Sequence, residues 1–273
     1  MSTRPLTAWA VAAAAATVLA AEPAAAPALT ADQIVERNAA ARGGLEAWRK
    51  VGSMAWSGRV ESAGRGGRKA PFLLEQVRPD RTRFEVTIDG QKSVRVFDGS
   101  EGWKMRTSAT GRPEVQPYTA AELRFARGAP MIEGPLMDHA ARGATIALAG
   151  VQEVEGRTAY ALDLRLASGS AYRVWIDAES FLELRYDREA LSAQGWPTLT
   201  SVFFADYRAV QGLQVPFVIE TGTPDGTARD RLVIERVDVN PRLDDQIFAK
   251  PGPGVTRRRG VAVDARSAAR PAP

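Results

Sequence analysis

Residues 160–186 read YALDLRLASGSAYRVWIDAESFLELRY, and this stretch decides the fold class. Within it, apolar residues occupy every second position from Tyr160 to Leu166 and again from Tyr172 to Ile176. A period of two is typical of a strand that buries one face. The small and polar residues at 167–170 and 177–180 are suited to tight turns. The stretch therefore predicts consecutive antiparallel strands.

The same alternation extends through most of the chain in both directions. It begins at Ser53, and Asp89–Gly90 carries a strong hairpin signal between two such segments. The pattern continues to Phe248 and predicts about ten to twelve strands, spaced 8–12 residues apart as is usual for antiparallel sheets. Strands and helices do not alternate, which argues against a doubly wound nucleotide-binding fold.

Two regions carry a helical pattern instead. Thr30 and Gln33 form a capping box ahead of a helix that ends at Gly43–Gly44, and Leu45–Trp48 predicts a second short helical turn. Residues 117–142 interrupt the strands. There the sequence predicts a helix over Tyr118–Arg127 and a second short helix over Ile132–Arg142.

The N-terminal residues have the pattern of an export signal. Arg4 supplies a positive charge, and Trp9–Ala20 is an uncharged, alanine-rich run that is too short to span a bilayer. We expect residues 1–21 to be a signal peptide cleaved after Ala20 or Ala21, which predicts a periplasmic protein. Residues 22–30 are then a linker, 31–250 a single domain, and 251–273 a disordered basic tail.

Charge and cysteine content exclude several classes of function. The chain has 36 basic and 32 acidic residues, but five arginines lie in residues 251–273, and residues 22–250 hold 30 basic and 31 acidic residues. A nucleic-acid-binding face would need a local basic excess that the body as a whole does not have. The absence of cysteine excludes disulfides, thiolate metal sites and a lipid anchor on cysteine.

The candidate catalytic groups are few. His139 is the single histidine, and no Gly-x-Ser-x-Gly motif accompanies it. The carboxylate pairs Asp177/Glu179 and Asp244/Asp245 lie in predicted turns, where aspartate commonly binds turn amides. We therefore expect no enzyme, no cofactor and no metal site, and we keep a hydrolase using His139 or a carboxylate pair as a weaker alternative.

The predicted shape points to binding. A long sheet with one apolar face and two small helical elements can form a curved, unclosed barrel. If the helices fill only part of the inner face, an apolar cavity remains that suits acyl chains. If they fill all of it, the space is packed core. The residues alone leave both alternatives open.

Six segments, made mainly of turn and strand residues, have a recognisable pattern. They are Ala31–Asn38, Ala41–Trp48, Val96–Trp103, Glu133–Asp138, Val154–Tyr160 and Trp175–Leu182. These segments resemble the LolA-like periplasmic proteins, which include outer-membrane lipoprotein-sorting proteins, and the resemblance covers roughly residues 31–250. It implies a mainly β fold with α-helices, a single unclosed antiparallel half-barrel with short helices as a lid over an apolar cavity.

Together these observations predict a periplasmic carrier that binds lipoprotein acyl chains or another lipid and delivers them toward the outer membrane. The alternative is a lipid- or lipoprotein-sensing module that acts through a protein partner. Expected partners are acyl chains and components of membrane transport systems, and we expect a monomer. The predicted cavity residues are Trp56, Phe72, Leu74, Phe84, Val86, Val96, Leu162, Leu164 and Val174, and the predicted lid residues are Leu123, Phe125 and Leu136.

Overall fold

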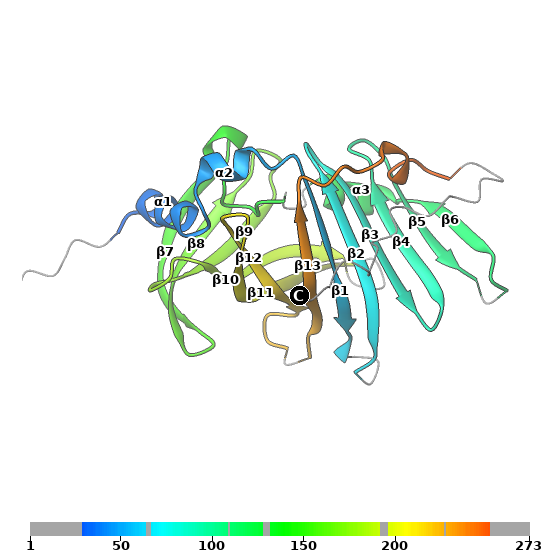
Figure 1. The fold of residues 1–273 in the computed structure, drawn as a ribbon. Coiled ribbons are helices and arrows are strands. Elements are labelled where there is room, and N and C mark those ends of the chain that lie inside the picture. The colour runs from blue at the N-terminus through cyan, green and yellow to red at the C-terminus, as the bar shows by residue number, and fades with distance from the viewer. Residues whose placement is uncertain are drawn as a thin grey trace, which may run out of the picture.

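The computed structural model describes residues 29–63, 67–108, 110–127, 132–191, 196–226 and 228–251. The predicted signal peptide lies outside these residues, as do the predicted linker up to residue 28 and the predicted tail from residue 252. The described residues form one antiparallel sheet with a few short helices (Figure 1).

The helices are short and the strands are of ordinary length for antiparallel sheets. In chain order the elements are α1 (Ala31–Ala41), α2 (Leu45–Arg49), β1 (Ser53–Glu61), β2 (Lys69–Val77), β3 (Arg81–Ile88), β4 (Gln91–Phe97), β5 (Gly102–Thr107), β6 (Pro113–Pro117), α3 (Ala120–Arg127), the 3₁₀ helix η2 (Ala140–Arg142), β7 (Thr145–Val154), β8 (Arg157–Arg165), β9 (Ala171–Asp177), β10 (Glu183–Leu191), β11 (Pro197–Val210), β12 (Leu213–Gly222), β13 (Asp230–Val239) and the 3₁₀ helix η3 (Asp245–Ile247).

The sheet is not closed. Its 13 strands follow the order β6-β5-β4-β3-β2-β1-β13-β12-β11-β10-β9-β8-β7, so β6 and β7 are its two edges. The pairing of β1 with β13 joins a wing made of β1–β6 to a wing made of β7–β13. The predicted mainly β, unclosed antiparallel half-barrel is confirmed. The strand count is higher than predicted, partly because the short β6 gave no clear alternation.

The sequence signals at the first helix are confirmed. Thr30 Oγ1 accepts a hydrogen bond from the Gln33 amide (3.2 Å), and Gln33 Oε1 accepts one from the Thr30 amide (3.0 Å). Gly43 ends the turn after α1 with a φ of 106°, and a Cβ there would lie 2.4 Å from the carbonyl oxygen of Gly212. Only glycine fits a position that combines this φ with such a close backbone approach.

The predicted hairpin at Asp89–Gly90 is also confirmed. Both residues have positive φ, 50° and 76°, as a two-residue type I′ turn requires. Glu155–Gly156 joins β7 to β8 in the same way, with φ values of 50° and 78°. These turns fix the register of the strands that they join and therefore decide which side chains share a face.

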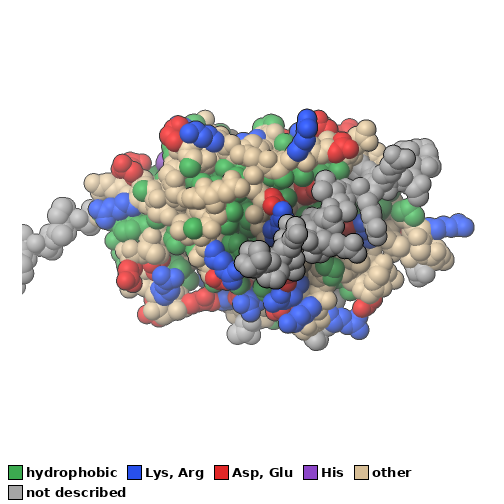
Figure 2. Space-filling model, in the orientation of Figure 1, with side chains coloured by type: hydrophobic (Ala, Val, Ile, Leu, Met, Phe, Trp, Pro, Cys, Tyr) green, Lys and Arg blue, Asp and Glu red, His purple; other side chains and the backbone are tan. Residues whose placement is uncertain are grey.

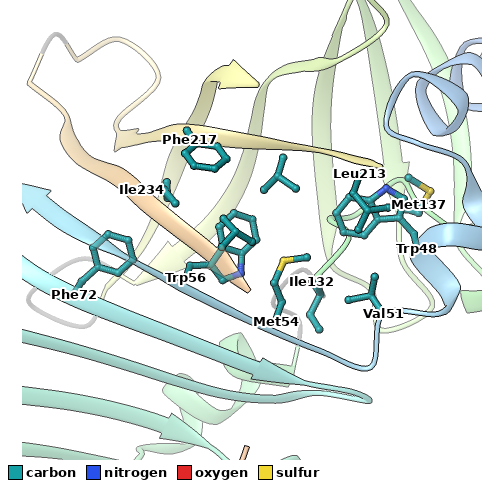
Figure 3. Packing of buried hydrophobic residues seen from close by; sticks show 12 residues of the cluster. Trp48, Val51, Met54, Trp56, Phe72, Ile132, Met137, Leu213, Phe217 and Ile234 are labelled. Atoms are coloured by element: carbon teal, nitrogen blue, oxygen red, sulfur yellow. The ribbon is translucent and has the colours of Figure 1, made fainter. Parts of the chain in front are cut away.

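Most of the core lies on one face of the sheet, which we call the inner face. On it, one cluster of buried side chains joins Trp48 of α2 to residues of β1, β2, β12 and β13. In Figure 3, Trp48 lies at one end of this cluster beside Leu213, and Phe72 lies at the other end. A second cluster joins Ile34 and Val35 of α1 to residues of β8–β11. Ile219 of β12 contacts both clusters, so the two parts of the core are continuous.

The outer face has a smaller apolar cluster on the β1–β6 wing. Phe248, which follows η3, covers Val96 of β4 and Trp103 of β5, and the Trp103 indole N–H donates to the Phe248 carbonyl oxygen (3.1 Å). In Figure 2, acidic and basic side chains are interspersed over the visible face. That mixture agrees with the nearly balanced charge of residues 22–250.

The predicted second helix over Ile132–Arg142 is wrong. Its first part forms turns, and only Ala140–Arg142 adopts a 3₁₀ helix. Gly134 has a φ of 85° and precedes Pro135, a pair that interrupts a helix. The segment 132–139 instead enters the core as an irregular strap, with Ile132, Leu136 and Met137 buried. We call residues 132–139 the strap.

Candidate functional site

Cross-strand register defines how the inner face is built on the β1–β6 wing. Trp56 of β1 pairs with Leu74 of β2, which pairs with Phe84 of β3. The row continues to Arg95 of β4 and Lys104 of β5. Directly paired side chains project from the same face of a sheet. The inner face therefore changes from apolar to cationic between β3 and β4.

The predicted cavity residues fall into different environments. Five of them lie in the packed core with 6% exposure or less, namely Trp56, Phe72, Leu162, Leu164 and Val174. Three are only half-buried, Leu74, Phe84 and Val86, and all project from the inner face of β2 and β3. The contacts thus favour packed core over most of the inner face, with a partly exposed apolar surface on β2 and β3.

Val96 is a correction to the predicted set. It pairs with Arg83 and Trp103, whereas Phe84 pairs with Arg95, so Val96 projects from the opposite face to Phe84. Val96 is fully buried because Phe248 covers it from the outside. It belongs to the outer apolar cluster and has no access to the inner face.

The predicted lid separates into two parts. Leu123 and Phe125 lie on α3 and are half-buried, and α3 has no fully buried side chain. Leu136 lies on the strap, is fully buried and packs in the same cluster as Leu162 and Leu164. Only α3 therefore has the exposure expected of a movable cover, and Leu136 is a core residue.

α3 lies between the two wings, since it contacts both β5 and β10. Its N-terminus is a capping box, in which Thr119 Oγ1 accepts from the Glu122 amide (3.2 Å) and Glu122 Oε2 accepts from the Thr119 amide (2.9 Å). Tyr118 leads into the helix with its ring over Gly102 of β5, where a Cβ would lie 2.0 Å from the ring. A side chain at Gly102 would displace the start of α3.

Ion pairs hold α3 against the sheet. The Glu122 carboxylate accepts from Arg95 (2.9 Å) and from Lys104 (2.9 Å), the two cations in the row of Phe84. Burial by itself raises the pKa of Glu122. The Thr119 amide, Lys104 and Arg95 outweigh that effect and lower the pKa to about 2. The carboxylate is therefore ionised at neutral pH and joins α3 to β4 and β5. We call Glu122, Arg95 and Lys104 the α3 clasp.

The strap is held by a separate, buried polar network. Glu133 is 2% exposed and forms an ion pair with Arg78 (2.8 Å). Arg42 donates to the Glu133 carbonyl oxygen (2.5 Å) and to the Glu183 carboxylate (3.0 Å). Burial and the charge of Glu183 raise the pKa of Tyr207 well above its usual value, so Tyr207 stays a neutral donor to Glu183 (3.3 Å). Unlike α3, the strap is tied down deep in the core.

No family model and no curated protein sequence matches the chain. A solved structure of a LolA superfamily protein from Nitrosomonas europaea is similar, with a TM-score of 0.52 and 13% sequence identity over 82% of this chain and 99% of that chain. The chain has a LolA-like fold.

Two further solved structures are similar at lower scores. A DUF1329 family protein from Desulfovibrio piger has a TM-score of 0.48 and 12% identity, over 79% of this chain and 97% of that one. A domain from Vibrio parahaemolyticus described as outer membrane lipoprotein-sorting has a TM-score of 0.48 and 10% identity, over 79% and 94%. The LolA-like fold agrees with the resemblance that the turn and strand segments carry.

Within this LolA-like fold, two of the carboxylates singled out in the sequence, Asp177 and Asp244, bind amides of their own turns. Asp177 Oδ1 accepts from the amide of Ser180 (2.7 Å), and Asp244 Oδ1 accepts from the amide of Gln246 (2.9 Å). His139 directly precedes η2. In the described ranges, no group of three His, Cys, Asp or Glu side chains is placed to hold a metal ion, and no helix is long and apolar enough to cross a membrane.

A surface pocket of about 340 Å³ lies away from the inner face. It lies at the ends of β1, β12 and β13, near the start of β2. Glu61 of β1 pairs with Arg231 of β13 there, and both residues line the pocket. Five of its eight lining residues are polar or charged, and four of these carry a charge, which does not suit an acyl chain. The lining residues are Glu61, Ser62, Ala63, Gly67, Glu220, Ala228, Arg229 and Arg231.

Sequence reasoning missed the α3 clasp. The signal for the helix start was present, because Thr119 and Glu122 have the spacing of a capping box. The contacts of Glu122 with Arg95 and Lys104 were not visible in the sequence, since they join segments 27 and 18 residues apart. They depend on α3 folding back over the inner face.

We predict that Glu122→Gln will loosen α3 without unfolding the sheet. Glutamine keeps the capping interaction but removes both ion pairs, so we expect a loss of about 1–2 kcal/mol confined to α3. Hydrogen exchange should show faster exchange at residues 120–127 and unchanged protection in β8 and β9. Glu153→Gln, an exposed change on β7, is the control. Uniformly faster exchange across the sheet would contradict a local clasp.

The same clasp should respond to acid. The pKa of Glu122 is lowered in the folded protein, so its contribution is complete above the ordinary value of 4.5 and is lost as the pH falls toward about 2. Exchange of α3 in the unsubstituted protein should therefore approach that of the Glu122→Gln variant in this window.

Proposed function

We propose that this chain is an exported, non-enzymatic carrier that holds an acyl chain of a lipid or lipoprotein on the inner face and delivers it toward the outer membrane. The observation that carries the proposal is the half-buried apolar surface of Leu74, Phe84 and Val86, with α3 beside it. The Phe84 and Phe72 rings lie 6.0 Å apart and extend this surface into the core. The LolA-like fold supports the proposal at the level of architecture.

In this proposal, Leu123 and Phe125 of α3 complete the apolar surface formed by Leu74, Phe84 and Val86. Leu123 and Phe125 are half-buried, and the helix is held by polar groups at its start and not by buried apolar side chains. A cover held by ion pairs can move without exposing a large apolar core, because the free-energy cost of breaking partly exposed ion pairs is small. Movement of α3 would widen access to Phe84 and Val86, whereas the strap keeps the rest of the core packed.

Export follows from the sequence pattern of residues 1–21, and we propose a periplasmic, monomeric protein after cleavage at Ala20 or Ala21. The proposed partners are acyl chains together with membrane transport components that load and unload the carrier. Mass spectrometry of the protein purified from the periplasm tests two parts at once, since it reads the N-terminal residue and any lipid that co-purifies. A mature protein that retains residues 1–21, or one that never carries an acyl compound, would contradict the proposal.

We predict that Phe84→Glu will abolish acyl binding while the protein stays folded. A carboxylate on the apolar surface would have to be desolvated by a bound chain, which should weaken binding at least about 30-fold. Fluorescence titration with a neutral pyrene-labelled fatty-acid methyl ester measures the change.

Thr87→Glu provides the matched control, because Thr87 lies on the same strand and pairs with Lys92 on the opposite face to Phe84. We expect that variant to bind the ester as the unsubstituted protein does. Equal binding by the folded Phe84→Glu protein would show that the acyl chain does not use this surface.

A further inference from the structure

The inner face carries cations that its own carboxylates do not neutralise. On the β1–β6 wing, Arg95 and Lys104 share the single carboxylate of Glu122. In the next row, Val86 pairs with Ser93, and Ser93 pairs with Arg106. Arg106 forms no ion pair within the described part of the chain, although Glu114 of β6 lies opposite it in register. The apolar surface at Phe84 and Val86 is thus bordered by three cations, and the carboxylates of Glu122 and Glu114 lie on the same face.

The opposite wing contributes a further cation. Arg188 of β10 pairs with Tyr172, a residue of the inner apolar cluster, so it projects from the inner face. Its Nε is buried without a hydrogen-bond partner, as are those of Arg42, Arg83, Arg142 and Arg229. Those four arginines each form an ion pair with a carboxylate, whereas among the described residues no carboxylate forms an ion pair with Arg188. The desolvation of the Arg188 guanidinium is therefore the least compensated of the five.

The surroundings of Arg188 are hydroxyl groups. Burial raises the pKa of Tyr172 to about 12 and also raises that of Tyr186, and the charge of Arg188 acts against both increases. The guanidinium therefore lies near two neutral hydroxyls, and no ion pair joins it to a carboxylate of the described residues. β10, which carries Arg188, and β5, which carries Lys104 and Arg106, both contact α3. The strands that carry these cations therefore lie on either side of the same helix.

We propose that the ligand of this inner face is a lipid with an anionic headgroup, whose acyl chain lies on Phe84 and Val86 and whose headgroup is bound beside α3 by Arg106 and Arg188. This inference rests on the proposed function and adds the charge class of the ligand. Arginine suits a phosphate diester because its planar fork of donors matches the phosphate oxygens. A neutral acyl chain would leave the Nε of Arg188 without an acceptor.

The test compares two lipids with one acyl chain. Palmitoyl lysophosphatidylglycerol and monopalmitoylglycerol, which lacks the phosphate, are titrated below their aggregation concentrations, and binding is followed by tryptophan fluorescence. We expect the anionic lipid to bind about tenfold more tightly, and Arg188→Gln and Arg106→Gln each to remove most of that preference. Arg173→Gln removes one charge from the outer face, where Arg173 pairs with Asp163, and should leave the preference intact.

The possible outcomes distinguish a failure of the anionic-headgroup inference from a failure of the proposed carrier function. Equal binding of both lipids would overturn the anionic headgroup and leave the carrier in place, whereas binding of neither would overturn both. A preference that survives Arg188→Gln and Arg106→Gln would also overturn the assigned residues. Arg188→Lys keeps the charge and should keep at least part of the preference, which distinguishes loss of charge from loss of folding in the glutamine variant.

Discussion

Replacement of Leu164 by glutamate will prevent the protein from folding. Leu164 is 1% exposed and packs against Leu136 of the strap and Val174 of β9. The substitution removes that packing and places a carboxylate in the apolar core. The two effects together should cost more than about 5 kcal/mol, which is comparable to the whole stability of many domains. Thermal unfolding followed by circular dichroism should show no cooperative transition.

Leu148→Glu is the matched control. Leu148 pairs with Leu162 from the edge strand β7 and is 37% exposed, so its glutamate can reach water. We expect this variant to melt within a few degrees of the unsubstituted protein. A cooperative transition of ordinary enthalpy in Leu164→Glu would mean that the packed core around Leu136 is open to solvent.

Replacement of Arg42 by leucine should lower the free energy of unfolding by about 3–5 kcal/mol. The change leaves the Glu183 carboxylate, 5% exposed, without its cation, and a buried unpaired charge is costly. It also removes the hydrogen bond to the strap at Glu133 and the contact of the guanidinium with the Trp48 ring, 4.4 Å away. Urea unfolding followed by tryptophan fluorescence measures the loss.

Two further variants show whether the loss of stability comes from the buried charge of Glu183. Arg49→Leu removes exposed ion pairs with Glu46 and Asp138 and should cost less than about 1 kcal/mol. The double variant Arg42→Leu with Glu183→Leu removes both charges and should recover part of the stability lost in the single variant. A single variant as stable as Arg49→Leu would show that Glu183 is not effectively desolvated.

Leu164 and Phe84 show that the sequence predicts which strand face is apolar but not how deeply each residue on it is buried. Alternation places both residues on apolar strand faces, and no local sequence pattern distinguishes a packed position from a half-buried one. They differ in what covers them, since Leu164 lies beneath the strap and Phe84 beside a loosely held α3. That difference depends on where residues 117–142 pack against the sheet. Because Gly134–Pro135 interrupts any regular period in this segment, its course across the sheet cannot be predicted from the spacing of apolar residues.

Val96 illustrates a second limit. The alternation of β4 shows correctly that Val94 and Val96 share a face and that Arg95 projects from the other. It does not show which face is the inner one. We assigned the apolar side inward, but the outer face is apolar here because Phe248, 152 positions later, covers it. Local features such as the Thr30–Gln33 capping box and the Asp89–Gly90 turn were predictable because their causes lie within a few residues.

The pairing of β1 with β13 has a consequence for biosynthesis. Met54 pairs with Val239, so the pairing at the middle of the sheet joins the first of the described strands to the last. Until β13 emerges, the strands β1–β6 present an unsatisfied backbone edge at β1, and such an edge favours intermolecular pairing. The chain is therefore open to self-association at β1 until β13 is in place, and a chain that stops short of Asp230 leaves two separate sheets.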